Sequence, residues 1–244
     1  MDAIVLAGGF AKRMWPLTKN KPKQLLSLAG KPMLDYVINS LRPINPKRII
    51  VSVNSLFSPQ FRDYLDSVKH FTNVELFVEE SNNEEQKLGA LGALNLLFNT
   101  YNLKGPVFIA GGDNLSDFNL KEMVGVYERT DKDVIGLFDV GSFELAKLYG
   151  IAELDEDRII DFLEKPSSPP STLAATAYWL LSKSGISNFY NYLENGGDRD
   201  ALGHFLAWNV RKNPVHSVSF TGNWYDIGSL NSYSEAQKWI EDRP

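Results

Sequence analysis

The chain has 244 residues, of which 43% are hydrophobic and 23% charged, so it is long enough to bury a large core. The absence of cysteine excludes disulfides, zinc–thiolate sites, iron–sulfur clusters and cysteine nucleophiles. The net charge of −5 disfavours a general nucleic-acid-binding surface, and no apolar run approaches the roughly 18–20 residues that span a bilayer. With no signal-peptide pattern at the N-terminus, these features predict a soluble, cytoplasmic protein without nucleic-acid or membrane partners.

Short apolar strands alternate with helical patterns through the first half of the chain. The predicted strands are Ala3–Ala7, Arg48–Val53, Val74–Val78 and Val107–Ala110. The predicted helices are Pro32–Leu41, Ser58–Val68 and a segment that starts at Leu88. Such alternation predicts a mainly parallel sheet covered by helices on both faces.

The second half is less regular. The predicted strands are Asp133–Val140, Ile151–Leu154, Ile159–Leu163, Ala174–Leu181 and Val215–Phe220. The predicted helices are Ile186–Leu193, Ala201–Val210 and Leu230–Ile240, and Ser232 and Glu235 have the spacing of a capping box. The Pro/Ser loop at Pro166–Ser171 is too short for an interdomain linker, so we expect one domain over residues 1–244.

Positive charge is concentrated near the N-terminus. Between Ala3 and Leu34 there are six basic residues and no acidic one, which leaves −11 for the rest of the chain. A compact basic patch on an acidic protein suits a small polyanion better than a long phosphate backbone. A solvated basic loop is the competing interpretation of the charge alone.

A double glycine, Gly8-Gly9, follows the first predicted strand, where backbone amides can approach a phosphate or a base closely. A dinucleotide-binding fingerprint would need a helix to begin at once, but Pro16 and Pro22 interrupt the segment. No Gly-Lys-Ser/Thr follows, so a Walker A loop is absent. Alone, the double glycine is equally typical of a tight structural turn.

Several segments together resemble the NDP-sugar pyrophosphorylase, or sugar-1-phosphate nucleotidylyltransferase, family. In chain order they are Leu6–Arg13 continuing to Lys23, Gly89-Ala90-Leu91, Gly112-Asp113, Tyr149-Gly150, Glu164-Lys165-Pro166 and Trp224–Gly228. The resemblance implies a single Rossmann-like α/β domain with a mixed, mainly parallel sheet and flanking helices, of the nucleotide-diphospho-sugar transferase type. It also implies a nucleotide half at about 1–130 and a sugar-phosphate half at about 131–244. The left-handed β-helix domain that many members carry is not expected.

The resemblance implies a catalytic role for Arg13 and Lys23, with Arg13 on the β- and γ-phosphates and Lys23 on the α-phosphate. Arginine suits a forked phosphate contact and lysine a point-charge contact. The implied nucleotide-binding residues are Ala7, Gly8, Gly9, Arg13, Lys23, Gly89 and Asp113.

The same resemblance makes Asp113 and Asp226 the ligands of Mg²⁺, which favours carboxylate oxygens together with phosphates and water. Taken alone, Asp113 is typical of a turn and Asp226 of a helix cap. The implied sugar-phosphate-binding residues are Gly150, Glu164 and Lys165. Without the family, Glu164-Lys165 is an ordinary exposed charge pair.

The chain also departs from the family pattern. Ala11 stands where a glycine is usual, and Glu84 stands where a glutamine commonly reads the base. Ala174 and Thr176 replace an asparagine and a glycine expected near the sugar. The expected activity is therefore transfer of a nucleotidyl group to a sugar 1-phosphate, first to glucose 1-phosphate from dTTP or UTP. The alternatives are a mannose-1-phosphate guanylyltransferase, another phospho-alcohol nucleotidylyltransferase, and a non-catalytic module of the same fold.

Overall fold

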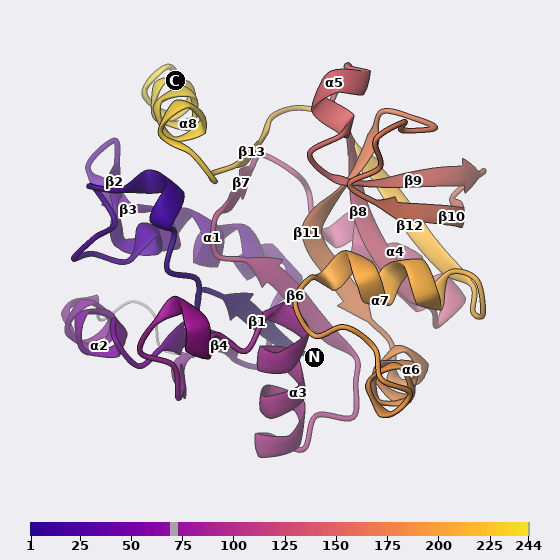
Figure 1. Ribbon diagram of the computed structural model, residues 1–244, viewed down its shortest axis with the longest axis horizontal. Helices are drawn as coiled ribbons and strands as arrows, with labels where there is room; N and C mark the ends of the chain where they lie inside the picture. The colour runs from indigo at the N-terminus through magenta and orange to yellow at the C-terminus, as the bar shows by residue number, and fades with distance from the viewer. Residues whose placement is uncertain (69–72, 244) are drawn as a thin grey trace. The chain divides into compact units, whose positions relative to one another are not determined.

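The computed structural model describes residues 1–68 and 73–243, and within them the chain forms two compact units. The N-terminal unit contains Asp2–Lys87, Ala110–Asp117 and the segment that starts at Asn223. The central unit contains Leu88–Ile109 and Phe118–Gly222, together with Met1. The chain therefore passes from one unit to the other several times, and Figure 1 shows the elements of both.

Parallel strands form the sheet of the N-terminal unit, in the order β5-β4-β1. These strands are β1 (Asp2–Leu6), β4 (Ile49–Asn54) and β5 (Val74–Glu79), as the apolar runs predicted. Every residue of β4 is buried, which is typical of a strand covered on both faces. Strand β6 (Val107–Gly111) ends in this unit, and the next residue, Gly112, donates a hydrogen bond to the Leu6 carbonyl.

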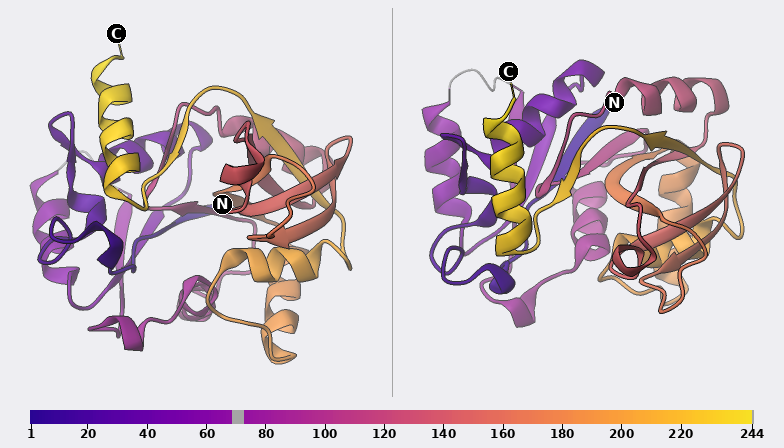
Figure 2. Two further views of the ribbon diagram at one scale, coloured as in Figure 1. Left: turned by 45° about the horizontal axis from the view of Figure 1, so that its top comes forward. Right: turned by 90° about the horizontal axis from the view of Figure 1, so that it is seen from above.

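Helices α1 (Met33–Leu41), α2 (Ser58–Ser67) and α8 (Leu230–Glu241) complete the N-terminal unit. Its smaller elements are η1 (Lys12–Met14), η2 (Lys23–Leu25), η3 (Arg42–Ile44), η4 (Glu84–Gln86), β2 (Ser27–Leu28), β3 (Lys31–Pro32), β7 (Asn114–Ser116) and β13 (Trp224–Asp226). Figure 2 shows α8 beside the β2–β3 hairpin, and Tyr233 of α8 donates a hydrogen bond to the Ser27 carbonyl. The predicted capping box lies one turn too late, because Ser229 is the N-cap and Ser232 its partner.

Antiparallel pairing dominates the central unit. Its strands are β8 (Asp133–Asp139), β9 (Gly150–Asp155), β10 (Arg158–Glu164), β11 (Leu173–Leu181) and β12 (Val215–Phe220). They follow the order β11-β8-β12-β10-β9, and β9 returns to pair with β11 at Ile151 and Ala174. Only the β8–β12 pairing among these five strands is parallel.

The predicted mixed sheet with flanking helices is confirmed, but the prediction that its strands are mainly parallel is wrong, because antiparallel pairing dominates the central unit. Parallel neighbours need a crossover of about a dozen residues, whereas β9 and β10 are joined by the two residues Glu156 and Asp157. Glu156 has a left-handed φ of 54°, which suits such a tight turn.

The helices of the central unit are α3 (Ala90–Thr100), α4 (Lys121–Thr130), α5 (Phe143–Ala146), α6 (Lys183–Glu194) and α7 (Leu202–Asn209). Helices α4 and α5 were not predicted. Helix α7 packs on β10, and Figures 1 and 2 show it beside the β9–β10 hairpin. In the described residues, no helix combines the length and the apolar character that a membrane crossing requires.

Candidate active site

The glycine loop follows the carboxyl end of β1, the edge of a parallel sheet at which ligands bind. The Ala7 amide donates to the Ser52 carbonyl at 2.8 Å, and Asn54 Nδ2 donates to the Gly8 carbonyl at 3.0 Å. Neither the Gly8 nor the Gly9 amide donates to any group of the described chain. The loop is thus held through the Ala7 amide and the Gly8 carbonyl, while the Gly8 and Gly9 amides remain available to a ligand.

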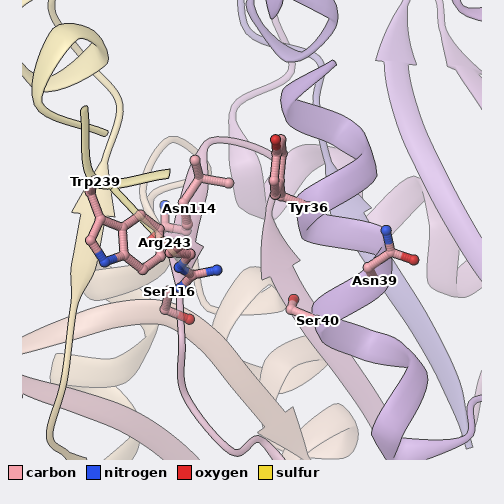
Figure 3. Close-up of a pocket in the computed structure, with 8 residues that line it drawn as sticks. Tyr36, Asn39, Ser40, Asn114, Ser116, Trp239 and Arg243 are labelled. Atoms are coloured by element: carbon pink, nitrogen blue, oxygen red, sulfur yellow. The ribbon is translucent and has the colours of Figure 1, made fainter. Parts of the chain in front are cut away.

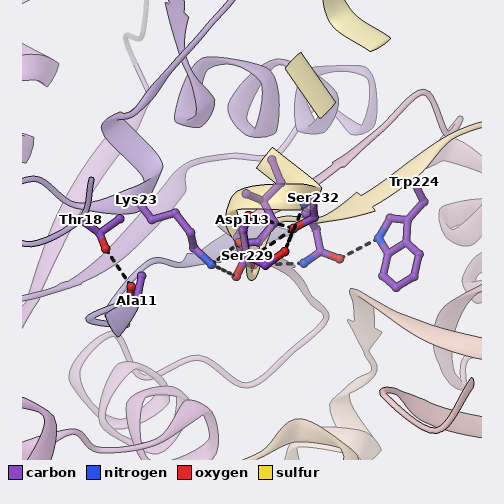
Figure 4. Close-up of polar contacts among 9 residues, drawn as sticks. Ala11, Thr18, Lys23, Asp113, Trp224, Ser229 and Ser232 are labelled. Atoms are coloured by element: carbon purple, nitrogen blue, oxygen red, sulfur yellow. Dashed lines mark hydrogen bonds and ion pairs between the residues drawn. The ribbon is translucent and has the colours of Figure 1, made fainter. Parts of the chain in front are cut away.

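Arg13 lies beside the segment that follows β13. A β-carbon built at Gly228 would lie 3.5 Å from Arg13 Nη2. The loop before Arg13 turns at Ala11, whose left-handed φ of 48° explains why a glycine is usual there. Thr18 holds this turn by donating to the Ala11 carbonyl at 2.8 Å, as Figure 4 shows.

Lys23 is buried and is held by two oxygens. Its Nζ lies 2.5 Å from Asp113 Oδ2 and donates to the Ile227 carbonyl at 2.7 Å (Figure 4). Burial pushes the pKa of Asp113 upward, but the Lys23 charge and the hydrogen bonds from Lys23 and Asn114 outweigh it, so the pKa lies below its usual value. The predicted phosphate-binding lysine and metal-binding aspartate therefore contact each other directly.

Two short strands that were not predicted connect the aspartates. Strand β13 pairs with β7 so that Asp226 stands opposite Asn114, and the Ile227 amide donates to the Asp113 carbonyl at 3.0 Å. Trp224 Nε1 donates to Asn114 Oδ1 at 2.8 Å, and Asn114 Nδ2 lies 3.1 Å from Asp113 Oδ1 (Figure 4). The Asn114 side chain thus orients the Asp113 carboxylate.

The residues present fit a magnesium ion. Asp113, directly before β7, and Asp226, at the end of the paired strand β13, supply hard oxygen donors. Among residues 1–68 and 73–243, no group of three or more His, Cys, Asp or Glu side chains is arranged to hold a metal. A two-carboxylate site agrees with the way Mg²⁺ keeps several waters and shares ligation with substrate phosphates.

The predicted sugar-phosphate residues lie together in the central unit. Glu164 stands opposite Gly150 across the β9–β10 pairing, and a β-carbon built at Gly150 would lie 2.8 Å from Glu164 Oε2. Lys165 Nζ lies 3.9 Å from Glu164 Oε1 and remains exposed. Burial raises the pKa of Glu164, and the charges of Lys165 and His204 oppose that rise. Lys165 has a left-handed φ of 46°, a conformation that costs a non-glycine residue about 1–3 kcal/mol and is enriched at functional sites.

Gly203 and His204, on the first turn of α7, also belong to this cluster, although no sequence motif points to them. A β-carbon at Gly203 would collide with Glu164 Oε2. The missing side chain therefore gives the Glu164 carboxylate its room.

Gly203→Ala is accordingly expected to push the Glu164 carboxylate aside and to raise KM for the sugar phosphate by about tenfold or more, without changing KM for the triphosphate. Gly125→Ala on α4 is the matched control, because the nearest atom to its β-carbon is 3.6 Å away. Steady-state kinetics with each substrate varied in turn would test this. Equal effects of the two substitutions would contradict the role given to Gly203.

Three other residues singled out from the sequence have mainly structural surroundings. Gly89, in the central unit, has φ 73° and precedes α3, whose Ala90 amide donates to the Asp200 carbonyl at 2.7 Å. Ala174 and Thr176 are buried in β11, and Thr176 Oγ1 donates to the Gly136 carbonyl at 2.8 Å. The Thr176 hydroxyl therefore already has a partner within the protein.

A buried carboxylate that the sequence did not single out lies against the glycine loop. A β-carbon built at Gly8 would lie 2.6 Å from Glu79 Oε1 and 2.8 Å from Oε2. Glu79 ends β5, is 4% exposed, and accepts a hydrogen bond from Ser52 Oγ at 2.7 Å. Burial raises its pKa, and the Ser52 hydrogen bond opposes that rise.

A pocket of about 180 Å³ lies elsewhere in the N-terminal unit (Figure 3). It is lined by residues of α1, β7 and the C-terminal segment, namely Tyr36, Asn39, Ser40, Asn114, Leu115, Ser116, Trp239 and Arg243. The Arg243 guanidinium covers the Trp239 ring at 3.6 Å. None of the predicted binding residues lines this pocket, but it shares Asn114 with the cluster around Lys23.

The N-terminal unit therefore has the features of a nucleotide-binding α/β protein, with polar and basic groups at the carboxyl ends of parallel strands. Residues 2–243 match the family model described as "Nucleotidyl transferase". The chain belongs to this nucleotidyl transferase family.

Individual relatives agree with this family. The chain is 27% identical to the "Bifunctional sugar-1-phosphate nucleotidylyltransferase/acetyltransferase" of Sulfurisphaera tokodaii, over 99% of this chain and 56% of that protein. It is 26% identical to "Mannose-1-phosphate guanylyltransferase 1" of Arabidopsis thaliana, over 96% of this chain and 63% of that protein. The chain thus spans between about half and two thirds of the length of these curated relatives.

Solved structures share the fold. A "UDP-glucose pyrophosphorylase complexed with UDP-glucose" superposes with a TM-score of 0.83 at 21% identity, covering 99% of both chains.

Proposed function

We propose that this protein transfers a nucleotidyl group from a nucleoside triphosphate to a sugar 1-phosphate, with Mg²⁺ as cofactor. The observation that carries the proposal is the cluster of Lys23, Asp113 and the Trp224–Gly228 segment beside Arg13. Two anions must meet in this reaction, so charge neutralisation and alignment account for most of the catalysis.

The chemistry is a single displacement. An oxygen of the sugar phosphate attacks the α-phosphorus, a new P–O bond forms, and the bond from the α-phosphorus to the bridging oxygen breaks as pyrophosphate leaves. A bound Mg²⁺ would neutralise phosphate charge and be held by Asp113 and Asp226. Lys23 would move from Asp113 to the α-phosphate, where charge rearranges in the transition state. Arg13 would stabilise the departing pyrophosphate through its forked guanidinium.

Glu164 and Lys165 would bind the second substrate. The Glu164 carboxylate can accept hydrogen bonds from sugar hydroxyls, and the exposed Lys165 ammonium can contact the sugar phosphate. The glycines at positions 150 and 203 leave room around this carboxylate.

The proposal is tested by measuring pyrophosphate release from a panel of triphosphates and sugar 1-phosphates. Glucose 1-phosphate with dTTP or UTP is the pair first expected from the sequence. Mannose 1-phosphate with GTP is the second candidate, supported by the name of the Arabidopsis relative and by the Glu79 carboxylate. Release that depends on both substrates supports an enzyme. No release with any pair would favour a non-catalytic module.

Arg13→Ala is expected to raise KM for the triphosphate, and Lys165→Ala to raise KM for the sugar phosphate, each by roughly tenfold to a hundredfold. The reason is that the two side chains belong to different substrate-binding clusters. Separate KM values for both substrates would check this division. If each substitution raised KM for both substrates equally, the assignment of the two clusters would be wrong.

A further inference from the structure

Glu79 is a buried acid whose carboxylate accepts one hydrogen bond from the described residues. Among the described residues only Ser52 donates to its carboxylate, through Oε1, and no Lys, Arg or His side chain pairs with it. Glu79 is 4% exposed, yet Oε2 is not among the fully buried side-chain atoms that lack a hydrogen-bond partner in the described residues. This oxygen can therefore accept hydrogen bonds from a ligand.

The position of this carboxylate points to the ligand. Strands β1, β4 and β5 are parallel neighbours, so their carboxyl ends lie at one edge of the sheet. Glu79 ends β5, Asn54 ends β4 and holds the Gly8 carbonyl, and the free Gly8 amide follows β1. A base that hydrogen-bonds to the glycine loop would therefore lie within reach of Glu79.

We propose that Glu79 reads the base and selects guanine, an inference that rests on the proposed nucleotidyl transfer. Guanine carries two adjacent donors on one edge, N1–H and the exocyclic amine, which match the two acceptor oxygens of a carboxylate. Uracil and thymine present one N–H between two carbonyl oxygens, so a carbonyl oxygen of the base would face a carboxylate oxygen of Glu79. Adenine and cytosine each place a ring nitrogen acceptor beside their amine.

Ser52 and Gly8 prepare this contact. The Ser52 hydroxyl fixes Oε1 while Oε2 keeps its acceptor positions. Gly8 has no side chain, and a β-carbon there would overlap the carboxylate. The family spacing instead pointed to Glu84 as the residue that reads the base. Glu84 lies in η4, and its carboxylate already pairs with Lys87 at 3.4 Å.

The test is calorimetric binding of GTP, UTP, dTTP and ATP to the full chain with Mg²⁺ and without sugar phosphate. Wild type is expected to bind GTP about tenfold or more tightly than UTP. Glu79→Gln should lose this preference, because its affinity for GTP falls about tenfold to a hundredfold while its affinity for UTP does not fall. Glu84→Gln and Glu80→Gln are matched controls that should keep the preference. Ser52→Ala keeps the carboxylate and should reduce the ratio of GTP affinity to UTP affinity to a smaller extent. This variant replaces Glu79→Gln in the test if Glu79→Gln fails to fold.

Three results would each overturn the role of Glu79. They are equal affinity of wild type for GTP and UTP, an unchanged preference for GTP in Glu79→Gln, and loss of that preference in Glu84→Gln. In those cases nucleotides still bind, so the proposed function survives. If no nucleotide binds at all, the proposed function fails together with the inference.

Discussion

Replacing Asp226 with alanine is expected to lower kcat by about a thousandfold or more, because a metal ion contributes several kcal/mol of transition-state stabilisation in reactions of this kind. The free energy of unfolding should change by less than about 1 kcal/mol, since the substitution leaves the β7–β13 backbone pairing in place. Turnover with and without excess chelator, together with thermal unfolding, measures both quantities.

Asp242→Ala, at the exposed end of α8, is the control for loss of one negative charge in the same unit. It should retain wild-type turnover. Full activity of wild type in excess chelator, or of the Asp226 variant in magnesium, would exclude the metal assignment.

Replacing Lys23 with methionine should have two effects that can be separated. In the proposed reaction the Lys23 ammonium contacts the α-phosphate, so its removal is expected to lower kcat by about a hundredfold to a thousandfold. It also leaves the Asp113 carboxylate without its cation. Fully buried pairs lose about 3–5 kcal/mol when one partner is removed, but the Asp113 side chain is 29% exposed, so a loss of about 1–3 kcal/mol is expected.

Magnesium should restore part of that stability in the Lys23 variant and much less in wild type, because only the variant leaves Asp113 uncompensated. Lys21→Met is the control, since Lys21 is exposed in the same loop. Chemical unfolding with and without Mg²⁺, in the absence of nucleotide, reads out the stability separately from activity. An unchanged stability of the Lys23 variant would show that the ion pair is not a stabilising contact.

Local sequence patterns predicted most of the elements but not the direction of all strands. The strand β12 and the helix α1 lie within a residue of their predicted ranges, because their apolar periodicity is strong. The antiparallel hairpin β9–β10 was missed, since a two-residue connection is visible only when both strand ends are known. Strands β7 and β13 have three residues each, too few to establish a period of two.

The candidate site was predictable where the family motifs name residues and not where it depends on tertiary neighbours. Lys23 and Asp113 were both assigned from motifs, but their direct contact was not, because 90 residues separate them. Glu79 lies one residue beyond the predicted strand Val74–Val78 and was not singled out, and only the order β5-β4-β1 brings it to Gly8. Gly203 was missed because a glycine on a helix has no sequence signal that reveals which side chain it makes room for.

The contact between Lys23 and the Ile227 carbonyl has a consequence for how the protein is made. The two residues are 204 positions apart, and a ribosome adding about 5–20 residues per second needs roughly 10–40 s to cover that distance. During this time the glycine loop and Lys23 have been synthesised, but β7 has no β13 to pair with and α8 is missing. The cluster of Lys23, Asp113 and the Ile227 carbonyl therefore cannot assemble during translation of the first two hundred residues, and a chain released early would expose an unfinished basic loop.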